Sequence, residues 1–139
     1  MMADIAIDRS IVGQEFDRST FEPITPEEIM DYRAASGEPS ATAAAETTAP
    51  PTFVVRMRGN RFMPANLGNL GRNGFDAGKD IEFGVPIRAG DVLTAVSTVH
   101  DLYEKTGRSG RMTFIVLRTT LTNHRGEQVA VIDQKMMFR

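Results

Sequence analysis

The stretch RMTFIVLRTTLT, from Arg111 to Thr122, decides the fold class of this chain. Its odd positions form a largely apolar stripe with the two-residue period of a β-strand: Thr113, Ile115, Leu117, Thr119 and Leu121. The opposite face is also apolar, at Met112, Phe114 and Val116. We therefore expect one end of the sheet to be covered on both sides, by a helix and by a partner subunit.

Similar segments on either side of this stretch complete a sheet. Their Val, Ile, Thr and Phe content predicts strands at Asp80 to Phe83, Asp91 to Tyr103, Arg111 to Thr122 and Glu127 to Phe138. Turn-forming residues separate these segments at 86–91, 105–110 and 123–126. Such connections are too short for a parallel return, so the last three strands are predicted to form an antiparallel meander.

The first half of the chain carries one clear helix signal. Thr25 is a candidate N-cap, Pro26 stands at the first helical position, and Glu28 completes a capping box. Ile24 is placed to pack on Ile29 across this start. The pattern predicts a helix of about three turns that ends at the natural stop Gly37.

Other segments of the first half read as irregular. Residues 1–10 are expected to form a flexible arm. Residues 38–49 have no apolar period and no bulky side chain, which predicts a mobile surface loop. Residues 61–79 are loop-like, with a turn at Asn73-Gly74.

Local signals leave the segment Thr52 to Arg58 undecided between strand and helix. Val54 and Val55 suit a strand, whereas the prolines before them and Gly59 after them suit a helix. An antiparallel sheet needs a cover for its inner face, and this is the only remaining apolar segment. We therefore predict a helix here.

Composition bounds the class of protein. The chain has 139 residues, 41% of them hydrophobic, which is enough for one domain with a core. A net charge of -2 gives no electrostatic reason to expect nucleic acid as a partner. The lack of cysteine excludes disulfides, thiolate catalysis and cysteine-ligated zinc. No signal-peptide pattern and no membrane span are evident, so a cytoplasmic location is expected.

Three parts of the chain resemble the MaoC-like hydratase and dehydratase family, and more narrowly its N-terminal-type, non-catalytic half. They are VGQEFDRSTFEPITPEEIMDYRAASGE (12–38), APPTF (49–53) and the stretch from IEFGVPIRAGD to EQVAVI (81–132), in which FGVPIRAGD and EKTGRSGRMTF are the most specific. The resemblance implies a single α+β hot-dog domain over residues 11–139, with an antiparallel sheet wrapped around a central helix. It also implies side-by-side pairing of two such units.

The same resemblance implies addition or removal of water at the double bond of an enoyl thioester. The substrate is carried on coenzyme A or acyl carrier protein, and no further cofactor or metal is implied. This chemistry needs a base, an acid and donors to the thioester oxygen. In the family an Asp and, five positions later, a His supply the first two, following a Gly after the first helix.

This chain departs from that pattern. Gly37 is present, but Glu38 stands at the Asp position and Ala43 at the His position. No catalytic residue is therefore assigned, and the Asp and His are expected on a second hot-dog subunit. The histidines His100 and His124 fall in a predicted strand and a predicted turn, and are interpreted as structural or solvent-facing.

Five residues are candidate substrate contacts by their roles: Pro51, Thr52, Phe53, Arg108 and Arg111. The first three open the predicted central helix, where Thr52 and Phe53 offer backbone N–H groups to the thioester oxygen. Phe53 is alternatively a plain core residue. Arg108 and Arg111 suit carrier phosphates, or are two solvated charges of a hairpin.

Other charged residues have simpler interpretations. Arg56, Arg58 and Arg61 form a basic cluster around the predicted helix end, where cations complement the helix dipole. Asp91 follows the Arg88-Ala89-Gly90 turn and is interpreted as a turn residue.

The leading hypothesis is a non-catalytic, pocket-forming subunit of a heteromeric enoyl-thioester hydratase or dehydratase. The small residues of 38–49 leave room for a long or bulky acyl chain, such as a steroid-like one. One alternative is a self-sufficient homodimeric thioesterase or hydratase that activates water with Glu38 or Glu46. Another is a protein that binds acyl thioesters without chemistry.

Overall fold

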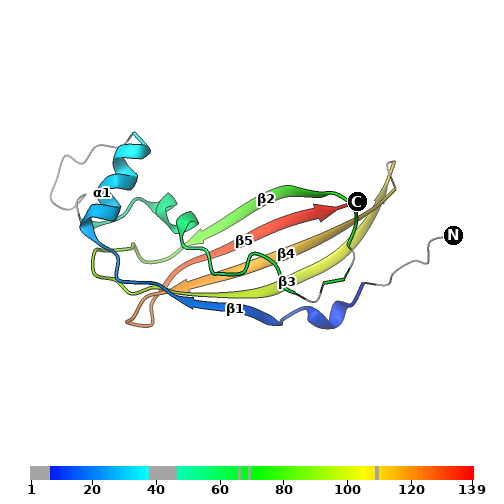
Figure 1. The fold of residues 1–139 in the computed structure, drawn as a ribbon, viewed down its shortest axis with the longest axis horizontal. Coiled ribbons are helices and arrows are strands. Elements are labelled where there is room, and N and C mark those ends of the chain that lie inside the picture. The colour runs from blue at the N-terminus through cyan, green and yellow to red at the C-terminus, as the bar shows by residue number, and fades with distance from the viewer. Residues whose placement is uncertain (1–6, 38–46, 66, 69, 109) are drawn as a thin grey trace.

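A computed structural model of the chain describes residues 7–37, 47–65, 67–68, 70–108 and 110–139. Five antiparallel strands form one sheet in the order β1-β3-β4-β5-β2 (Figure 1). Their bounds are β1 Glu15–Thr20, β2 Gly74–Phe83, β3 Thr94–Gly107, β4 Gly110–Thr122 and β5 Gln128–Phe138. The helix α1 (Pro26–Ala35) and the 3-10 helix η2 (Pro51–Arg56) lie at one end of this elongated sheet, and the β3-β4 hairpin projects from the other end (Figure 1).

The predicted meander of the last three strands is confirmed. β4 pairs with β3 from Thr94↔Thr122 to Gly107↔Gly110, and with β5 from Thr113↔Phe138 to Thr122↔Gln128. β3 ends at Gly107 and β4 begins at Gly110, so the connection is shorter than the predicted turn at residues 105–110. The predicted α+β hot-dog fold class is therefore confirmed as a single, mostly β domain.

Two strands of the first half were not predicted correctly. β1 was missed, and the expected loop over residues 61–79 is wrong from Gly74 onward, where β2 begins. β2 carries glycine and charged residues, and all its side chains except Ile81 are exposed. It is held by its backbone pairing with β5 from Gly74↔Phe138 to Phe83↔Ala130, a non-local contact that local propensity does not encode.

The capped helix forms as predicted. α1 spans Pro26–Ala35, and the Thr25 hydroxyl accepts a hydrogen bond from the Glu28 N–H at 3.1 Å. Ile29 on its inner side is fully buried, and Gly37 after its end takes a positive φ of 77°. Local capping chemistry is therefore sufficient to place this helix.

The segment predicted as the central helix is helical, but shorter than expected. η2 spans Pro51–Arg56 and is a 3-10 helix, which ends where the Met57 N–H donates to the Val54 carbonyl. Phe53 and Val54 on its inner side are buried at 1% and 3% exposure. A six-residue element covers only one end of the inner face of the sheet, which leaves the rest to the chain that follows it.

The core consists of two clusters along the inner face. The larger lies at the helical end, where Phe53 and Ile29 pack with Leu93, Ala95 and Leu121. The second lies toward the β3-β4 hairpin: Ile11, Val99, Leu102, Ile115 and Leu117. The odd-numbered stripe of β4 thus faces the core as predicted, with Ile115 and Leu121 fully buried.

The opposite face of β4 is partly covered by the chain itself. Phe114 stacks on Tyr103 of β3 with ring centroids 5.1 Å apart, and the Lys105 ammonium lies 5.6 Å from the Phe114 ring. Val116 is 9% exposed. The expectation that a partner subunit covers this end therefore stays a prediction.

The expected flexible arm lies largely outside the described residues. Within them, Asp8 caps the short 3-10 helix Arg9–Ile11, and Ile11 is buried against β3 and β4. Ile7 also packs against this second cluster. No helix in the described part of the chain has the length and apolar character needed to cross a membrane.

One cross-strand ion pair gives a stability prediction. Arg118 of β4 donates to both carboxylate oxygens of Asp133 of β5, each at 2.8 Å, and these hydrogen bonds hold the pKa of the Asp133 carboxyl below its ordinary value. A lowered folded-state pKa stabilises the fold above the unfolded pKa of about 4, and this stabilisation is lost as the pH falls through the folded pKa. Asp133→Asn should therefore lower the free energy of unfolding by roughly 1 kcal/mol at pH 7.

Urea denaturation at pH 7 and near pH 2.5 checks this prediction. The difference between Asp133→Asn and the native chain should shrink at the acid pH, whereas the exposed Glu22→Gln control should match the native chain at both. A deficit of equal size at both pH values would contradict the ion-pair explanation.

Candidate substrate pocket

α1 and η2 are locked together by their side chains. The Tyr32 hydroxyl donates to the Thr52 hydroxyl at 2.7 Å, and the Tyr32 and Phe53 rings meet edge to face at 5.3 Å. The Arg56 guanidinium lies over both rings, at 4.7 Å from that of Phe53 and 5.9 Å from that of Tyr32. Aromatic and cation–π contacts of this kind stabilise the position of η2 over the sheet.

The three predicted contacts at the start of η2 have different environments. Pro51 and Thr52 are exposed, whereas the Phe53 side chain is a core residue at 1% exposure. The Phe53 N–H donates to the Pro50 carbonyl at 2.9 Å, so the turn itself uses this donor. A thioester oxygen would therefore compete with the Pro50 carbonyl for the Phe53 N–H.

An apolar depression, here called the turn pocket, lies beside the start of η2. It is lined only by apolar side chains and Gly84: Ala49, Pro50, Pro51, Val54, Phe83, Val85, Pro86, Ile87 and Val129. The enclosed space, its open mouth included, is about 360 Å³. The Pro50-Pro51 and FGVPI motifs of the sequence therefore meet around one apolar hollow.

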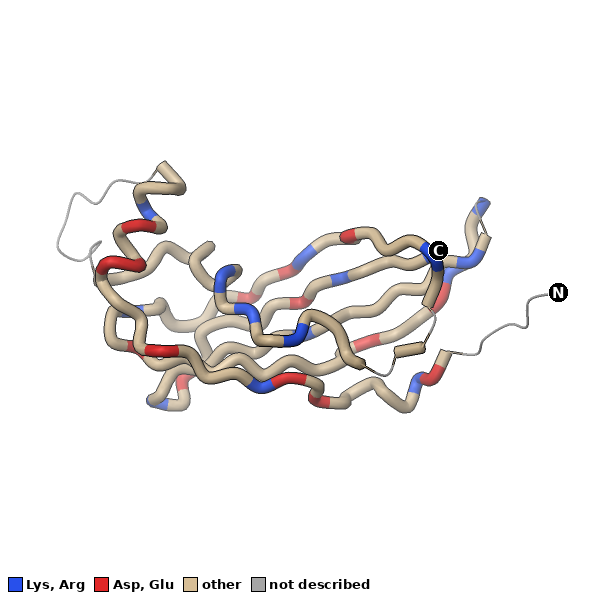
Figure 2. The backbone as a smooth tube through the Cα atoms, viewed as in Figure 1, with Lys and Arg blue, Asp and Glu red and all other residues tan. Residues whose placement is uncertain are grey.

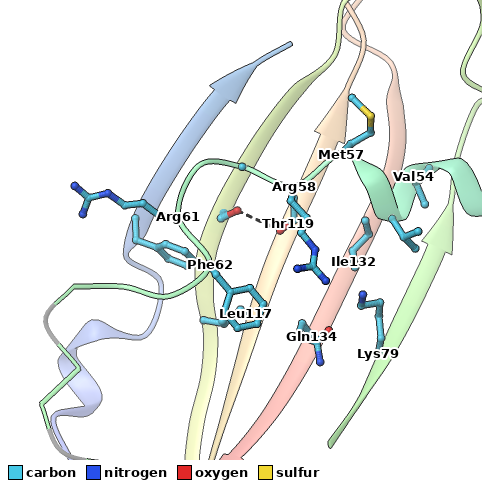
Figure 3. A pocket seen from close by; sticks show the side chains of 14 residues that line it. Val54, Met57, Arg58, Arg61, Phe62, Lys79, Leu117, Thr119, Ile132 and Gln134 are labelled. Carbon is cyan, nitrogen blue, oxygen red and sulfur yellow. Dashed lines mark hydrogen bonds between the residues drawn. The ribbon is translucent and has the colours of Figure 1, made fainter. Parts of the chain in front are cut away.

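A second depression, here called the sheet pocket, lies on the other side of η2 over the middle of the sheet (Figure 3). Its space, mouth included, is about 600 Å³. The apolar part of its lining comes from η2, the segment after it and three strands: Phe16, Val54, Val55, Met57, Phe62, Leu117 and Ile132. Val54 lines both pockets, so it separates the turn pocket from the sheet pocket.

Polar groups complete the sheet pocket. On its floor the Ser97 and Thr119 hydroxyls are hydrogen-bonded at 3.1 Å, and Gln134 lies beside them on β5 (Figure 3). Arg58, Arg61 and Lys79 supply three cationic groups, and no acidic residue is part of the lining. The pocket therefore suits a ligand with an extended apolar body.

The segment after η2 is fixed over β1. The Asn60 N–H donates to the Ser19 hydroxyl at 3.3 Å, and that hydroxyl donates to Asp17 Oδ2 at 3.1 Å. Gly59 passes so close to β1 that an added Cβ would lie 1.9 Å from Asp17 Oδ2. This close approach holds the outer wall of the sheet pocket against the edge of the sheet.

Arg108 and Arg111 lie far from both pockets. They belong to the β3-β4 hairpin, at the end of the sheet opposite η2 (Figure 1). Arg111 forms an ion pair with Glu104, and Arg108 is exposed. Within one chain they do not share a site with Pro51, Thr52 and Phe53, so their predicted contact with carrier phosphates stays a prediction.

The two histidines also lie outside the pockets. His100 is exposed at the β-bulge between Val99 and Asp101 of β3. His124 is exposed in the β4-β5 turn, where its Nδ1 accepts a hydrogen bond from the Val92 N–H at 3.2 Å. Among the described residues no cluster of three potential metal ligands occurs.

Asp91 has the structural role that the sequence predicted. It is 2% exposed, its Oδ2 accepts a hydrogen bond from the Arg88 N–H at 2.9 Å, and its Oδ1 accepts one from Arg125 at 3.1 Å. Gly90 takes a positive φ of 89° in this turn. Glu38, Ala43 and Glu46, the positions on which the catalytic comparison depends, lie outside the described residues.

Several pocket residues were not identified from the sequence. Leu117 and Thr119 lie on the predicted inner stripe of β4, so their position was available from the period of the strand. Lys79 fell in the expected loop, and Gln134 is a polar residue within a predicted strand. Only the pairing Lys79↔Gln134 shows that both belong to one face.

An antiparallel sheet with a short helical cover and an apolar pocket between the two defines a protein of the hot-dog class. The chain belongs to the family described as FAS1-like, dehydratase domain region, whose model matches residues 10–132. It is thus a member of a hot-dog dehydratase and hydratase family. The narrower assignment to a non-catalytic half stays a prediction.

Individual relatives agree with this class. A UPF0336 protein of Streptomyces avermitilis is 25% identical over 149 aligned residues, which cover 97% of each chain. The MaoC-like dehydratase from Rhodospirillum rubrum is similar in structure, with a TM-score of 0.65, 19% identity and 91% of each chain covered.

Two complexes from Mycobacterium tuberculosis are also similar in structure. The ChsH1-ChsH2 complex matches with a TM-score of 0.69 and 15% identity, covering 89% of this chain and 83% of that one. The HadBC (3R-hydroxyacyl-ACP dehydratase) complex matches with a TM-score of 0.61 and 23% identity, covering 87% and 93%. At these identities the likeness shows a shared fold.

The burial of Phe53 gives a second stability prediction. Phe53→Ala removes a fully buried ring between α1 and the sheet, and should lower the free energy of unfolding by about 3–5 kcal/mol. The neighbouring Thr52→Ala removes only an exposed hydroxyl bonded to Tyr32 and should cost about 1 kcal/mol. Urea denaturation of both variants checks this, and equal losses would contradict a core role for Phe53.

Proposed function

We propose that this chain is the non-catalytic, pocket-forming subunit of a heteromeric enoyl-CoA or enoyl-ACP hydratase or 3-hydroxyacyl dehydratase. The observation that carries the proposal is the lining of the turn pocket and the sheet pocket, where the described residues supply apolar, polar and cationic groups but neither histidine nor carboxylate. Carboxylates line two other depressions, with Asp91 and Glu127 in one and Glu22 and Glu28 in the other. A general base near neutral pH is usually an imidazole or a carboxylate. The base and the acid would therefore come from a second hot-dog subunit.

Two further observations support a heteromeric assembly. The chain is similar in fold to subunits of the ChsH1-ChsH2 and HadBC complexes, both named as assemblies of two different proteins. Its edge strand β2 is exposed along almost its whole length, with Phe75 and Phe83 at 40% and 51% exposure. An unpaired edge with exposed aromatic residues is suited to contact with another chain.

The proposed substrate is a long or bulky acyl thioester, of which a steroid-like chain is one example. The apolar side chains that line the sheet pocket support an acyl chain as its ligand. The thioester end would lie near Pro51 and Thr52, beside the turn pocket, and the acyl chain would pass Val54 into the sheet pocket. The proposal includes a cytoplasmic location and no resident cofactor or metal.

An activity assay tests the proposal. The purified chain alone should not hydrate crotonyl-CoA or a longer enoyl-CoA. Hydration is measured as the loss of ultraviolet absorbance of the conjugated thioester. Co-purification with a hot-dog protein that carries the Asp and His should restore turnover. Robust hydration or thioester hydrolysis by the isolated chain would support a self-sufficient enzyme and contradict the proposal. Binding without turnover in either sample would instead favour a binding protein.

Substitution of the histidines tests the same proposal at the level of residues. His100→Ala and His124→Ala should leave turnover of the two-subunit complex within a few fold of the native value, because neither imidazole lines a pocket. Circular dichroism serves as the folding control, since His124 accepts the Val92 N–H. A loss of several orders of magnitude in a folded variant would show that this chain supplies a proton-transfer group.

A further inference from the structure

The sheet pocket combines an apolar body with positive charge at its mouth. Figure 3 shows the Arg58 side chain leaning over the floor toward Ile132 and Gln134, and Lys79 rising beside Gln134. Arg61 points away from the pocket in the same view. Two of the three cationic lining residues therefore face the space in which an apolar ligand would lie.

Both facing cations lie near the Asp76 carboxyl, whose pKa is lowered first by hydrogen bonds from the Gly78 N–H and Gln134 and then by the charges of Lys79 and Arg58. Within the described part of the chain, neither Arg58 nor Lys79 forms an ion pair; Arg58 lies instead 5.6 Å from the Phe62 ring. Figure 2 shows that basic positions recur along the segment that passes in front of the sheet after η2. The mouth is thus a region of net positive charge beside an apolar surface.

Two carboxylates outside the pocket lining already accept hydrogen bonds from other donors. Asp76 accepts hydrogen bonds from the Gly78 N–H at 2.9 Å and from Gln134 Nε2 at 2.8 Å. Asp17 accepts one from the Ser19 hydroxyl at 3.1 Å. Neither carboxylate lines the pocket, so an anion bound between Arg58 and Lys79 would meet two cations without displacing an existing ion pair.

A ligand that satisfies this site has an apolar body and an anionic end. Charge-assisted hydrogen bonds from guanidinium and ammonium groups to a carboxylate are about twice as strong as neutral ones. In the proposed function the thioester lies on the turn-pocket side of Val54, so the far end of the acyl chain reaches the mouth of the sheet pocket. The anion then belongs to the acyl chain and not to its carrier.

We propose that the sheet pocket selects acyl thioesters whose chain ends in a carboxylate, held by Arg58 and Lys79. The chemical class is the monothioester of a dicarboxylic acid. This inference rests on the proposed function, because it takes the pocket as the site of the acyl chain. It adds a specificity that an apolar lining alone does not provide, since an apolar wall offers a carboxylate no partner for its charge.

Binding of two matched probes tests the inference. Titration calorimetry of the full chain, alone and with its co-purified partner, should show that suberyl-CoA binds at least tenfold more tightly than octanoyl-CoA, which has the same chain length without the distal carboxylate. Arg58→Ala and Lys79→Met should each remove most of this preference and leave octanoyl-CoA binding within about twofold. Lys79→Glu should reverse the preference. Arg72→Ala, at an exposed residue that lines neither pocket, is the matched control and should keep it.

Three results would overturn the inference, and they are distinguishable. If both probes bind equally and the variants change neither affinity, the cations do not bind the end of the acyl chain, although the proposed function stands. If the variants weaken both probes equally, and pantetheine thioesters that lack the nucleotide are unaffected, the cations hold the phosphates of the carrier. If neither probe binds alone or with the partner, the proposed function fails as well.

Discussion

The inner face of the sheet is apolar along most of its length, while the helical cover available to it is only six residues long. Phe53 and Val54 of η2 bury one end of that face, against Ala95, Leu121 and Ala130. Toward the β3-β4 hairpin a second cluster forms around Leu102 and Ile115. This mismatch between a long sheet and a short cover determines where the molecule can hold a ligand.

The sheet pocket lies where the two clusters meet. Its wall takes Val54, Met57 and Ile132 from the larger cluster and Leu117 from the smaller one. The segment after η2 closes the outer side, held by the Asn60 to Ser19 hydrogen bond. A longer α-helix over the same face would fill this space with its own side chains, because protein interiors pack to high density.

The sequence predicted those parts of the fold whose causes are local. The Thr25 cap specified α1, and the two-residue apolar period specified β4 and its neighbours. Only Asp80 to Phe83 of β2 were predicted as strand, because Gly74, Asp76 and Gly78 are poor strand formers and the earlier part of β2 depends on pairing with β5. The candidate site followed the same division. Pro51 of the APPTF motif lines the turn pocket, whereas Lys79 joined the sheet pocket only through that non-local pairing.

The charge of the pocket separates recognition from proton transfer. Arginine and lysine ordinarily have pKa values above 10, so at neutral pH they donate hydrogen bonds to an anion but do not remove a proton from water. A pocket lined by Arg58, Arg61 and Lys79, with hydroxyl and amide groups as its other polar side chains, is therefore equipped to bind and orient a substrate. In the proposed assembly the partner can then place its base and acid at the thioester end, while the distant cations determine which acyl chains reach it. In such an assembly this subunit binds the acyl chain and the partner transfers the proton, so the residues for the two tasks do not have to share one pocket.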